Sequence, residues 1–263
     1  MARTEHVFGE PDADSPYAAD TLARLALSVA ARQLTDFARG LVPISADGAA
    51  PDGALFADAL RLLSLAERVV EWTAVYERLA GTGWPVLGEV LGVTKQSAHE
   101  RYAEAEKRFR KALAEPETTN EFGAPYNRLP AGADDPEYWA AELDRWVVHH
   151  REPHDVDHGE HPVSAGLRRM DPFVELMELD RQVRALMAEY APLPLDRLAA
   201  IYERQAVLYD RLDDAVAAAG SGRGAAHNRE AAATCRARAA QLRVTIAATS
   251  PPASAGEPDA GTT

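Results

Sequence analysis

Apolar residues recur three or four positions apart along most of the chain, which is the spacing of one buried face of an α-helix. Alternating runs of Val, Ile, Thr and aromatic residues, which would indicate strands, are few. The pattern predicts an all-α protein with helices over residues 15–40, 55–80, 95–114, 135–148, 171–190 and 195–216, and a last helix after residue 224.

Pairs of neighbouring residues mark three of these helix starts. In each pair, a side chain that can accept a backbone N–H hydrogen bond precedes a proline, whose missing N–H costs nothing in the first turn. The pairs are Ser15 with Pro16, Asp135 with Pro136, and Asp171 with Pro172. They predict where the chain enters each helix.

The last two helices carry heptad spacing. The first seam contains Leu195, Leu198, Tyr202, Gln205, Tyr209, Leu212 and Val216. The second contains Asn228, Ala232, Cys235, Ala239, Leu242 and Ile246. Together they predict an antiparallel bundle or coiled-coil hairpin joined by a glycine-rich turn at 220–224, with the 171–190 helix as a third member. The spacing leaves open whether the seams close within one chain or between two.

Residues 84–102 (WPVLGEVLGVTKQSAHERY) have the pattern of a helix-turn-helix. The apolar positions where two short helices must pack together are Leu87, Leu91 and Val93. Gly88 falls where the helices cross most closely, and Gly92 suits the turn because glycine adopts positive φ without steric cost. Thr94 then suits the N-cap of a second helix over 95–114.

This stretch resembles the helix-turn-helix of sigma-factor region 4 and one common in small actinobacterial proteins. The matching positions are Trp84, Leu87, Gly88, Leu91, Gly92, Val93, Thr94, Lys95, Gln96, Arg101 and Tyr102. The match spans residues 65–113, under a fifth of the chain. The resemblance implies DNA binding, and in region 4 the arginine matched by Arg101 can turn inward to support the fold. Nothing resembles the region that melts promoters, so a sigma factor is not implied.

The helix over 95–114 is positively charged in an acidic chain. It carries six cations against three acids and is net positive by three, whereas the whole chain has a net charge of −13. DNA binding needs local positive charge that faces phosphates, and the rest of the protein can be acidic if it faces away. The charge therefore favours nucleic-acid binding over a plain packing corner, which is the alternative interpretation of the motif.

Side chains in the first two turns of such a helix reach base edges in the major groove. We expect base contacts from Lys95 to guanine and from Gln96 to adenine, with His99 beside them. Glu100 projects from the same turns. The side chains expected near phosphates are Thr94, Arg101, Lys107, Arg108, Arg110 and Lys111. Because one short helix gives limited affinity, we also expect a homodimer on double-stranded DNA.

Composition divides the chain further. The expected regions are a disordered start at 1–14, a helix-turn-helix domain at 15–116, a linker at 117–134, a helical interaction or dimerisation domain at 135–248 and a disordered tail at 249–263. One cysteine, Cys235, excludes an internal disulfide and suits a reducing compartment. No signal peptide or membrane span is evident. We therefore expect a cytoplasmic, nucleoid-associated protein without a membrane partner.

Residues 149–161 (HHREPHDVDHGEH) hold five of the eight histidines, interleaved with carboxylates. Imidazole and carboxylate groups ligate divalent transition metals, and the candidate ligands are His150, His154, His158 and His161. The prolines and glycine here oppose a continuous helix, and the spacing matches no known ligand signature. The segment is therefore interpreted as a solvated polar loop, with a metal site or a pH-sensitive contact as alternatives.

These observations predict a sequence-specific DNA-binding transcriptional regulator that reads the major groove through the 95–114 helix. The alternative is a protein-interaction module that docks on RNA polymerase or another regulator through its acidic second half. Residues 134–161 carry nine acids against two arginines, although a solvated face explains this equally well. No phosphate loop, nucleophile elbow, His-Glu zinc helix or paired CxxC is present, so neither an enzyme nor a cofactor is predicted.

Overall fold

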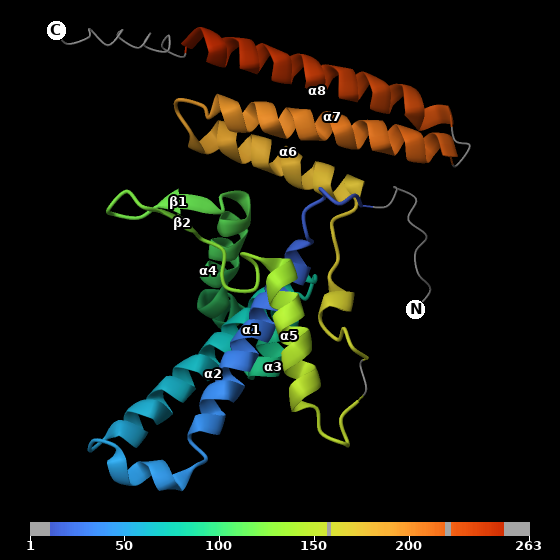
Figure 1. The fold of residues 1–263 in the computed structure, drawn as a ribbon. Helices are drawn as coiled ribbons and strands as arrows, with labels where there is room; N and C mark the ends of the chain where they lie inside the picture. The colour runs from blue at the N-terminus through green and yellow to red at the C-terminus, as the bar shows by residue number, and fades with distance from the viewer. Residues whose placement is uncertain (1–10, 157–158, 219–221, 250–263) are drawn as a thin grey trace, which may run out of the picture. The chain divides into compact units, whose positions relative to one another are not determined.

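The computed structural model of the protein describes residues 11–156, 159–218 and 222–249 (Figure 1). The described residues form eight α-helices, two short 3-10 helices and one two-stranded sheet, which confirms the all-α prediction. The elements are α1 (Ala19–Gly40), η1 (Ile44–Ala49), α2 (Ala54–Leu79), α3 (Trp84–Leu91), α4 (Lys95–Ala114), β1 (Glu117–Thr119), β2 (Pro125–Asn127), α5 (Pro136–His150), η2 (Ser164–Gly166), α6 (Pro172–Glu189), α7 (Leu195–Ala218) and α8 (Gly222–Thr249).

The predicted aspartate caps are confirmed. Asp135 accepts a hydrogen bond from the backbone N–H of Tyr138 at the start of α5. Asp171 accepts from the N–H groups of Phe173 and Val174 at the start of α6. Each aspartate satisfies backbone donors that a helix start leaves without partners.

The predicted cap at Ser15 is wrong. Helix α1 begins at Ala19 with Ala18 as its N-cap. Ser15 is fully buried instead, and its hydroxyl donates to Asp12 and accepts from Arg204. The sequence gives no sign of this partner, because Arg204 is 189 positions away.

Residues 1–14 were expected to be disordered, and for residues 11–14 this is wrong, because Asp12 is held by ion pairs. Its carboxylate pairs with Arg204 at 3.2 Å and with Arg211 at 2.5 Å. Burial alone would raise the pKa of Asp12, but hydrogen bonds from Arg204 and Ser15 outweigh burial and lower it. Arg204 also donates to the buried Glu175, so one arginine joins the start of the chain to α6.

The chain divides into two compact units at a different place from the predicted linker. Unit 1 contains residues 1–16 and 170–263, and unit 2 contains residues 17–169. Residues 117–134 are a folded part of unit 2, where β1 and β2 pair antiparallel. Gly132, at φ 101°, then passes so close to α1 that a Cβ there would lie 2.9 Å from the backbone nitrogen of Ala26. Only glycine allows this approach, and a turn-rich composition alone does not distinguish it from a linker.

In unit 1, helix α7 packs against α8 and also against α6 (Figure 1). The α7–α8 pair is antiparallel, because Asp213 pairs with Arg229 while Glu203 pairs with Arg243. The buried seam residues are Leu198, Tyr202, Gln205, Leu212, Ala232, Cys235 and Ala239. The question that the spacing left open is therefore answered, since these heptad seams close within one chain.

In unit 2, helices α1, α2 and α4 share a core with the loop before α5. Its buried members are Leu22, Ala23, Val75, Ala105, Phe109 and, from the loop, Ala133. Helix α5 packs on the other side of α1, where Ala140 and Leu143 meet Leu25 and Val29. Although α5 was predicted to belong to the second domain, its apolar face is buried against α1, and it therefore belongs to unit 2.

The two ends of unit 2 lie together. Tyr17 and Arg169 form an antiparallel backbone bridge, and the Arg169 guanidinium lies 4.3 Å from the centre of the Tyr17 ring. The N–H of Ala18 donates to the carbonyl of Arg168 at 2.8 Å. Both ends of this unit are therefore held by backbone hydrogen bonds and a cation–π contact.

Some predictions fall outside the described residues. These are the disorder of residues 1–10 and 250–263 and the turn at 220–221. The rest of the predicted turn, 222–224, is the start of α8. Among the described helices, none is long and apolar enough to cross a membrane.

Candidate nucleic-acid interface

Two glycines fix the angle between α3 and α4. Gly92 has φ 67°, in the left-handed region, and ends α3. A Cβ on Gly88 would lie 2.9 Å from the carbonyl oxygen of Val93 and 3.1 Å from the nitrogen of Lys95. The N–H of Val93 donates to the carbonyl of Gly88 at 2.9 Å. The two roles predicted for these glycines, the turn and the close crossing, are both confirmed.

Thr94 caps α4 as predicted. Its hydroxyl oxygen accepts from the N–H of Ser97 at 3.1 Å, and the hydroxyl donates to the Ser97 side chain at 3.0 Å. Thr94 thus accepts a backbone N–H that the helix start would leave without a partner, and α4 begins directly after it at Lys95.

The predicted base-reading side chains lie together on the exposed start of α4. Lys95, Gln96, His99 and Glu100 are all exposed. The Gln96 amide donates to the Glu100 carboxylate at 2.9 Å. The His99 ring meets the Trp84 ring edge to face, with centroids 5.2 Å apart. One helical turn thus presents a cation, an amide and an imidazole to solvent.

Helix α4 stands on an apolar base. Its buried positions are Ala98, Ala105, Phe109 and Ala112. The Phe109 ring meets Trp72 of α2 edge to face, with centroids 5.4 Å apart. The Arg78 guanidinium of α2 lies 4.6 Å from the centre of the Trp84 ring at the start of α3. Aromatic and cation–π contacts with α2 therefore hold the motif in place.

The cations of α4 fall into two groups. Arg108 pairs with Glu71 of α2 at 3.0 Å, and Arg110 pairs with Glu106 one turn away at 2.9 Å. The cations for which the described residues provide no acidic partner are Lys95, Arg101, Lys107 and Lys111. Arg101 is exposed rather than turned inward. The sequence grouped all six as one charge, and the structure separates ion-paired side chains from solvated ones.

One signal in the sequence was missed. All three lysines of the 263-residue chain, Lys95, Lys107 and Lys111, lie on α4, while every other basic side chain except histidine is an arginine. Arginine forms planar, bidentate ion pairs, whereas lysine is a strongly hydrated point charge on a flexible stem. All the lysines of the chain, which have no acidic partner among the described residues, therefore lie on one helix.

Helix α3 has a different surface. Val86 and Val90 are 51% and 80% exposed, with the exposed Glu89 between them. An acid and two valines do not attract phosphate, so the cationic face of the motif is confined to α4.

The histidine-rich segment does not bring its candidate ligands together in the described residues. His150 stacks on Trp146, donates from Nδ1 to the Trp146 carbonyl at 2.8 Å and contacts Arg39. His161 lies 3.6 Å from Asp144, and His154 is exposed. His158 lies outside the described residues. Within the described ranges, no group of three or more His, Cys, Asp or Glu side chains is placed to hold a metal ion.

Asp144 organises the segment that follows α5. It is 5% exposed and accepts from the N–H groups of Val163 and Ser164 and from the Ser164 hydroxyl. Burial alone would raise the pKa of Asp144, but these hydrogen bonds outweigh burial and lower it. The acidic stretch is thus partly used for internal contacts: Glu142 and Glu137 also pair with Arg32 and Arg169.

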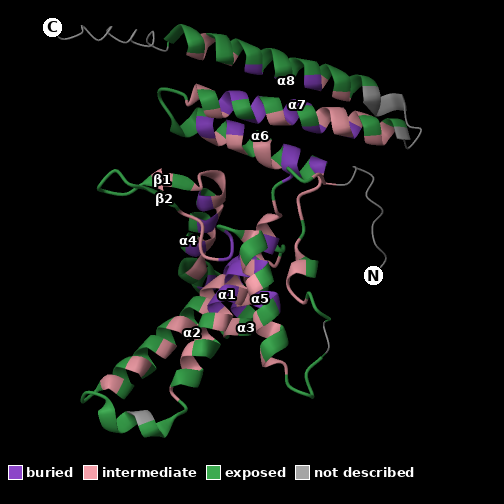
Figure 2. Ribbon diagram, in the orientation of Figure 1, coloured by how far each residue is buried: buried purple, intermediate pink, exposed green. Residues whose placement is uncertain are grey.

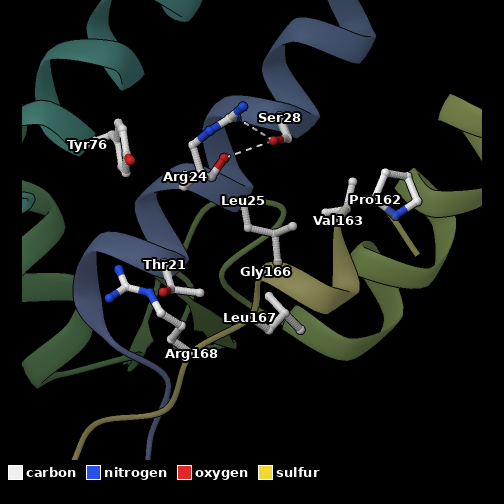
Figure 3. Close-up of a pocket in the computed structure, with 10 residues that line it drawn as sticks. All are labelled: Thr21, Arg24, Leu25, Ser28, Tyr76, Pro162, Val163, Gly166, Leu167 and Arg168. Atoms are coloured by element: carbon white, nitrogen blue, oxygen red, sulfur yellow. Dashed lines mark hydrogen bonds between the residues drawn. The ribbon is translucent and has the colours of Figure 1, made fainter. Parts of the chain in front are cut away.

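A small pocket lies beside this segment (Figure 3). Its volume is about 270 Å³, and Arg24 on its wall donates to Ser28 at 2.7 Å. Leu25 of α1, Tyr76 of α2 and Leu167 also line it. The pocket is smaller than most ligand sites, which hold about 300–1,000 Å³, and it is not assigned a ligand.

Comparison with protein families, curated proteins and solved structures found no match to this chain. Any functional assignment therefore depends on the residues themselves.

Proposed function

We propose that this protein is a sequence-specific DNA-binding transcriptional regulator that reads the major groove with the first turns of α4. The observation that carries the proposal is the exposed, glycine-positioned and threonine-capped start of α4, which bears Lys95, Gln96 and His99. A helix end of this kind fits the major groove, where a lysine can bind guanine and a glutamine can bind adenine.

Charge supports the proposal. Lys107 and Lys111 lie three and four turns beyond Gln96 on the solvent side of α4, and neither has an acidic partner among the described residues. Such solvated lysines bind phosphates by releasing counterions, which makes the affinity depend on salt. Arg108 and Arg110 would have to leave Glu71 and Glu106 to do the same, so we assign them a smaller part of the phosphate binding.

The lysine distribution permits a direct test without substitutions. Reductive methylation with ¹³C-formaldehyde preserves the charge of each lysine and labels Lys95, Lys107 and Lys111, together with the chain's amino terminus. Addition of a specific duplex should shift or broaden all three lysine signals at low salt, and the Lys95 signal should stay shifted at moderate salt. If the duplex moves none of them, α4 does not contact DNA.

Substitution separates base reading from phosphate binding. Against duplexes selected from genomic fragments, Lys95→Ala/Gln96→Ala should remove the preference for the selected site over random duplex, a loss of about 10- to 100-fold. Lys107→Ala should weaken all duplexes by a similar factor and lower the salt slope by about 1. Arg184→Ala, at an exposed arginine on α6, is the matched control and should change neither. Fluorescence anisotropy over a salt series measures all three.

A protein partner is the second candidate, and the exposed Val86 and Val90 of α3 favour it. These side chains would suit docking on RNA polymerase or another regulator better than they suit phosphates. Val90→Glu should leave DNA binding almost unchanged if α4 reads DNA, and should abolish capture of RNA polymerase if α3 docks on it. A homodimer on DNA and a nucleoid location belong to the first proposal.

A further inference from the structure

The outer half of the α1–α2 hairpin lacks a third layer. Between residues 31 and 73, no described side chain is buried, although the two helices pack on each other (Figure 2). At the base of the hairpin, in contrast, α4 and α5 cover α2 and α1. Two packed helices shield only the faces that they turn toward each other, so a second apolar stripe on either helix stays exposed to solvent.

Such a second stripe exists on α2. Phe56, Leu60, Leu63, Glu67 and Val70 follow each other at spacings of four, three, four and three, which is a heptad seam. The four apolar members are 70%, 51%, 56% and 45% exposed in that order. This set is called the α2 stripe below. Large apolar side chains exposed in such a continuous row mark an interaction surface.

We propose that a second copy of this chain covers the α2 stripe, so that two α1–α2 hairpins form an antiparallel four-helix bundle with its two-fold axis at Leu63. In an isologous interface each residue meets its counterpart across the axis, and the residue on the axis meets its own copy. Leu63 is the middle of the stripe, so Phe56 of one copy lies opposite Val70 of the other.

The flanks of the stripe fit a helix as the partner. The neighbouring positions on the two sides are Ala57, Ala59, Ser64, Ala66, Glu71 and Thr73, of which all but Glu71 are small. Small residues beside a seam let another helix approach closely. On a second copy, a matching heptad stripe is the α2 stripe itself, whereas the seams of α7 and α8 are already closed within unit 1. Residues 1–10 and 250–263, outside the described part, carry no apolar heptad.

Glu67 sets the direction of the partner. In a parallel pair, each seam position faces its own copy, so two Glu67 carboxylates would face each other. In the antiparallel pair, the two Glu67 side chains lie about 12 Å apart along the axis, at roughly 1.5 Å per residue. Like charges in contact are destabilising, so the antiparallel arrangement is favoured.

The spacing of the two copies is on the scale of DNA half-sites, and this step rests on the proposed function. Helix α4 is held to α2 through Glu71 and Arg78, which pair with Arg108 and Glu106. These anchors lie about 12 residues beyond Leu63, or about 18 Å along α2, so two copies place them about 36 Å apart. Half-sites read by helix-turn-helix dimers are separated by about 34–36 Å.

Sedimentation equilibrium of the full chain without DNA tests the interface. The wild type should be a dimer, and Leu60→Glu/Leu63→Glu should raise the dimer dissociation constant by at least about 100-fold, because it places four charges in a small apolar seam. Both residues are exposed in the monomer, so helix content should be retained. Val207→Glu, at an exposed apolar position on α7 in unit 1, is the control and should remain dimeric.

A variant that strengthens the dimer shows that the effects of substitution do not come from unfolding of the chain. Glu67→Leu removes the single charge in the stripe and should tighten the dimer by about tenfold or more. Wild-type protein that stays monomeric at every accessible concentration would overturn the proposal. So would a dimer that neither set of α2 substitutions changes.

Crosslinking places the axis. Leu63→Cys, in a chain that also carries Cys235→Ala, should form a disulfide-linked dimer under mild oxidation, whereas Phe56→Cys in the same background should not. The reverse result would place the axis elsewhere. Neither the sedimentation nor the crosslinking experiment contains DNA. A dimer that forms through the α2 stripe but binds no duplex would therefore refute the proposed function and still support the proposed interface.

Discussion

Two helical hairpins in this chain carry heptad stripes and differ in what covers them. In the α7–α8 hairpin of unit 1, Leu198 and Leu208 of α7 are 2% and 0% exposed, because α8 covers one side of α7 and α6 covers another. In the α1–α2 hairpin of unit 2, Leu60 and Leu63 of α2 are 51% and 56% exposed. Heptad spacing therefore predicts that a helix will pair, but it does not predict whether the partner comes from the same chain.

The difference lies in a third helix. A two-helix hairpin buries one face of each member, and α6 supplies the second layer that α7 needs. At the base of α2, α4 has the same function, and Glu71, which pairs with Arg108 of α4, directly follows Val70 of the α2 stripe. The α2 stripe is thus left without the third helix that α4 provides at the base of the hairpin.

The largest expected effect compares the two hairpins directly. Leu208→Ala should destabilise unit 1 by about 3 kcal/mol, because the removed side chain leaves a cavity in a closed core. Leu60→Ala should change the stability of the monomer by less than about 0.5 kcal/mol, because solvent already fills its surroundings. Urea unfolding at a protein concentration below the dimer dissociation constant measures both. Equal losses would mean that the outer face of α2 is covered within the chain.

A smaller effect is expected at the crossing of α3 and α4. Gly88→Ala adds a Cβ 2.9 Å from a backbone oxygen, and it should cost about 2 kcal/mol and weaken DNA binding, because α4 must shift. Gly40→Ala is the matched control at the end of α1, where a Cβ meets nothing within 4 Å. It should be neutral or stabilising by up to about 1 kcal/mol. Thermal unfolding and fluorescence anisotropy of the same samples measure both effects. If Gly88→Ala changed neither the stability nor the DNA affinity, the crossing of α3 and α4 would not be tight.

The smallest expected effect concerns pH. Because the folded pKa of Asp144 lies below its ordinary value of 3.8, its contribution is fully present above pH 3.8 and is lost as the pH falls through the folded pKa. Asp144→Asn should therefore destabilise unit 2 by about 1–2 kcal/mol at pH 7, and the gap from wild type should close in acid. Asp180→Asn, at an exposed aspartate of α6, is the control and should change the stability at pH 7 by less than about 0.5 kcal/mol. A gap that stays constant down to pH 2 would contradict the assignment.

Local chemistry was predictable from the sequence. Gly92, Thr94, Asp135 and Asp171 act within a few residues of themselves, so the α3–α4 turn and three helix starts follow from the residues present. The geometry of the candidate site was predictable for the same reason, since it depends on one turn and one cap. That the site binds DNA remains a prediction.

Long-range chemistry was not predictable. Ser15 has the same neighbour as the two aspartate caps, but the half-buried Arg204 of α7 donates to its hydroxyl instead. Gly132 belongs to a composition typical of linkers, but it packs on α1. The ion pairs that occupy Arg108 and Arg110 were equally hidden, because Glu71 lies 37 positions from Arg108. Each error involves a partner that the fold, rather than the neighbouring sequence, brings near.

The joined ends of unit 2 have a consequence for how such a protein can be rebuilt. The N–H of Met170 donates to the carbonyl of Pro16 at 2.8 Å, just outside the Tyr17–Arg169 bridge. Residues 17–169 therefore enter and leave unit 1 at a single point, as an inserted domain does. Joining residue 16 to residue 170 through a short turn would excise unit 2 without reaching across unit 1. The same junction would accept a different domain whose two ends lie equally close.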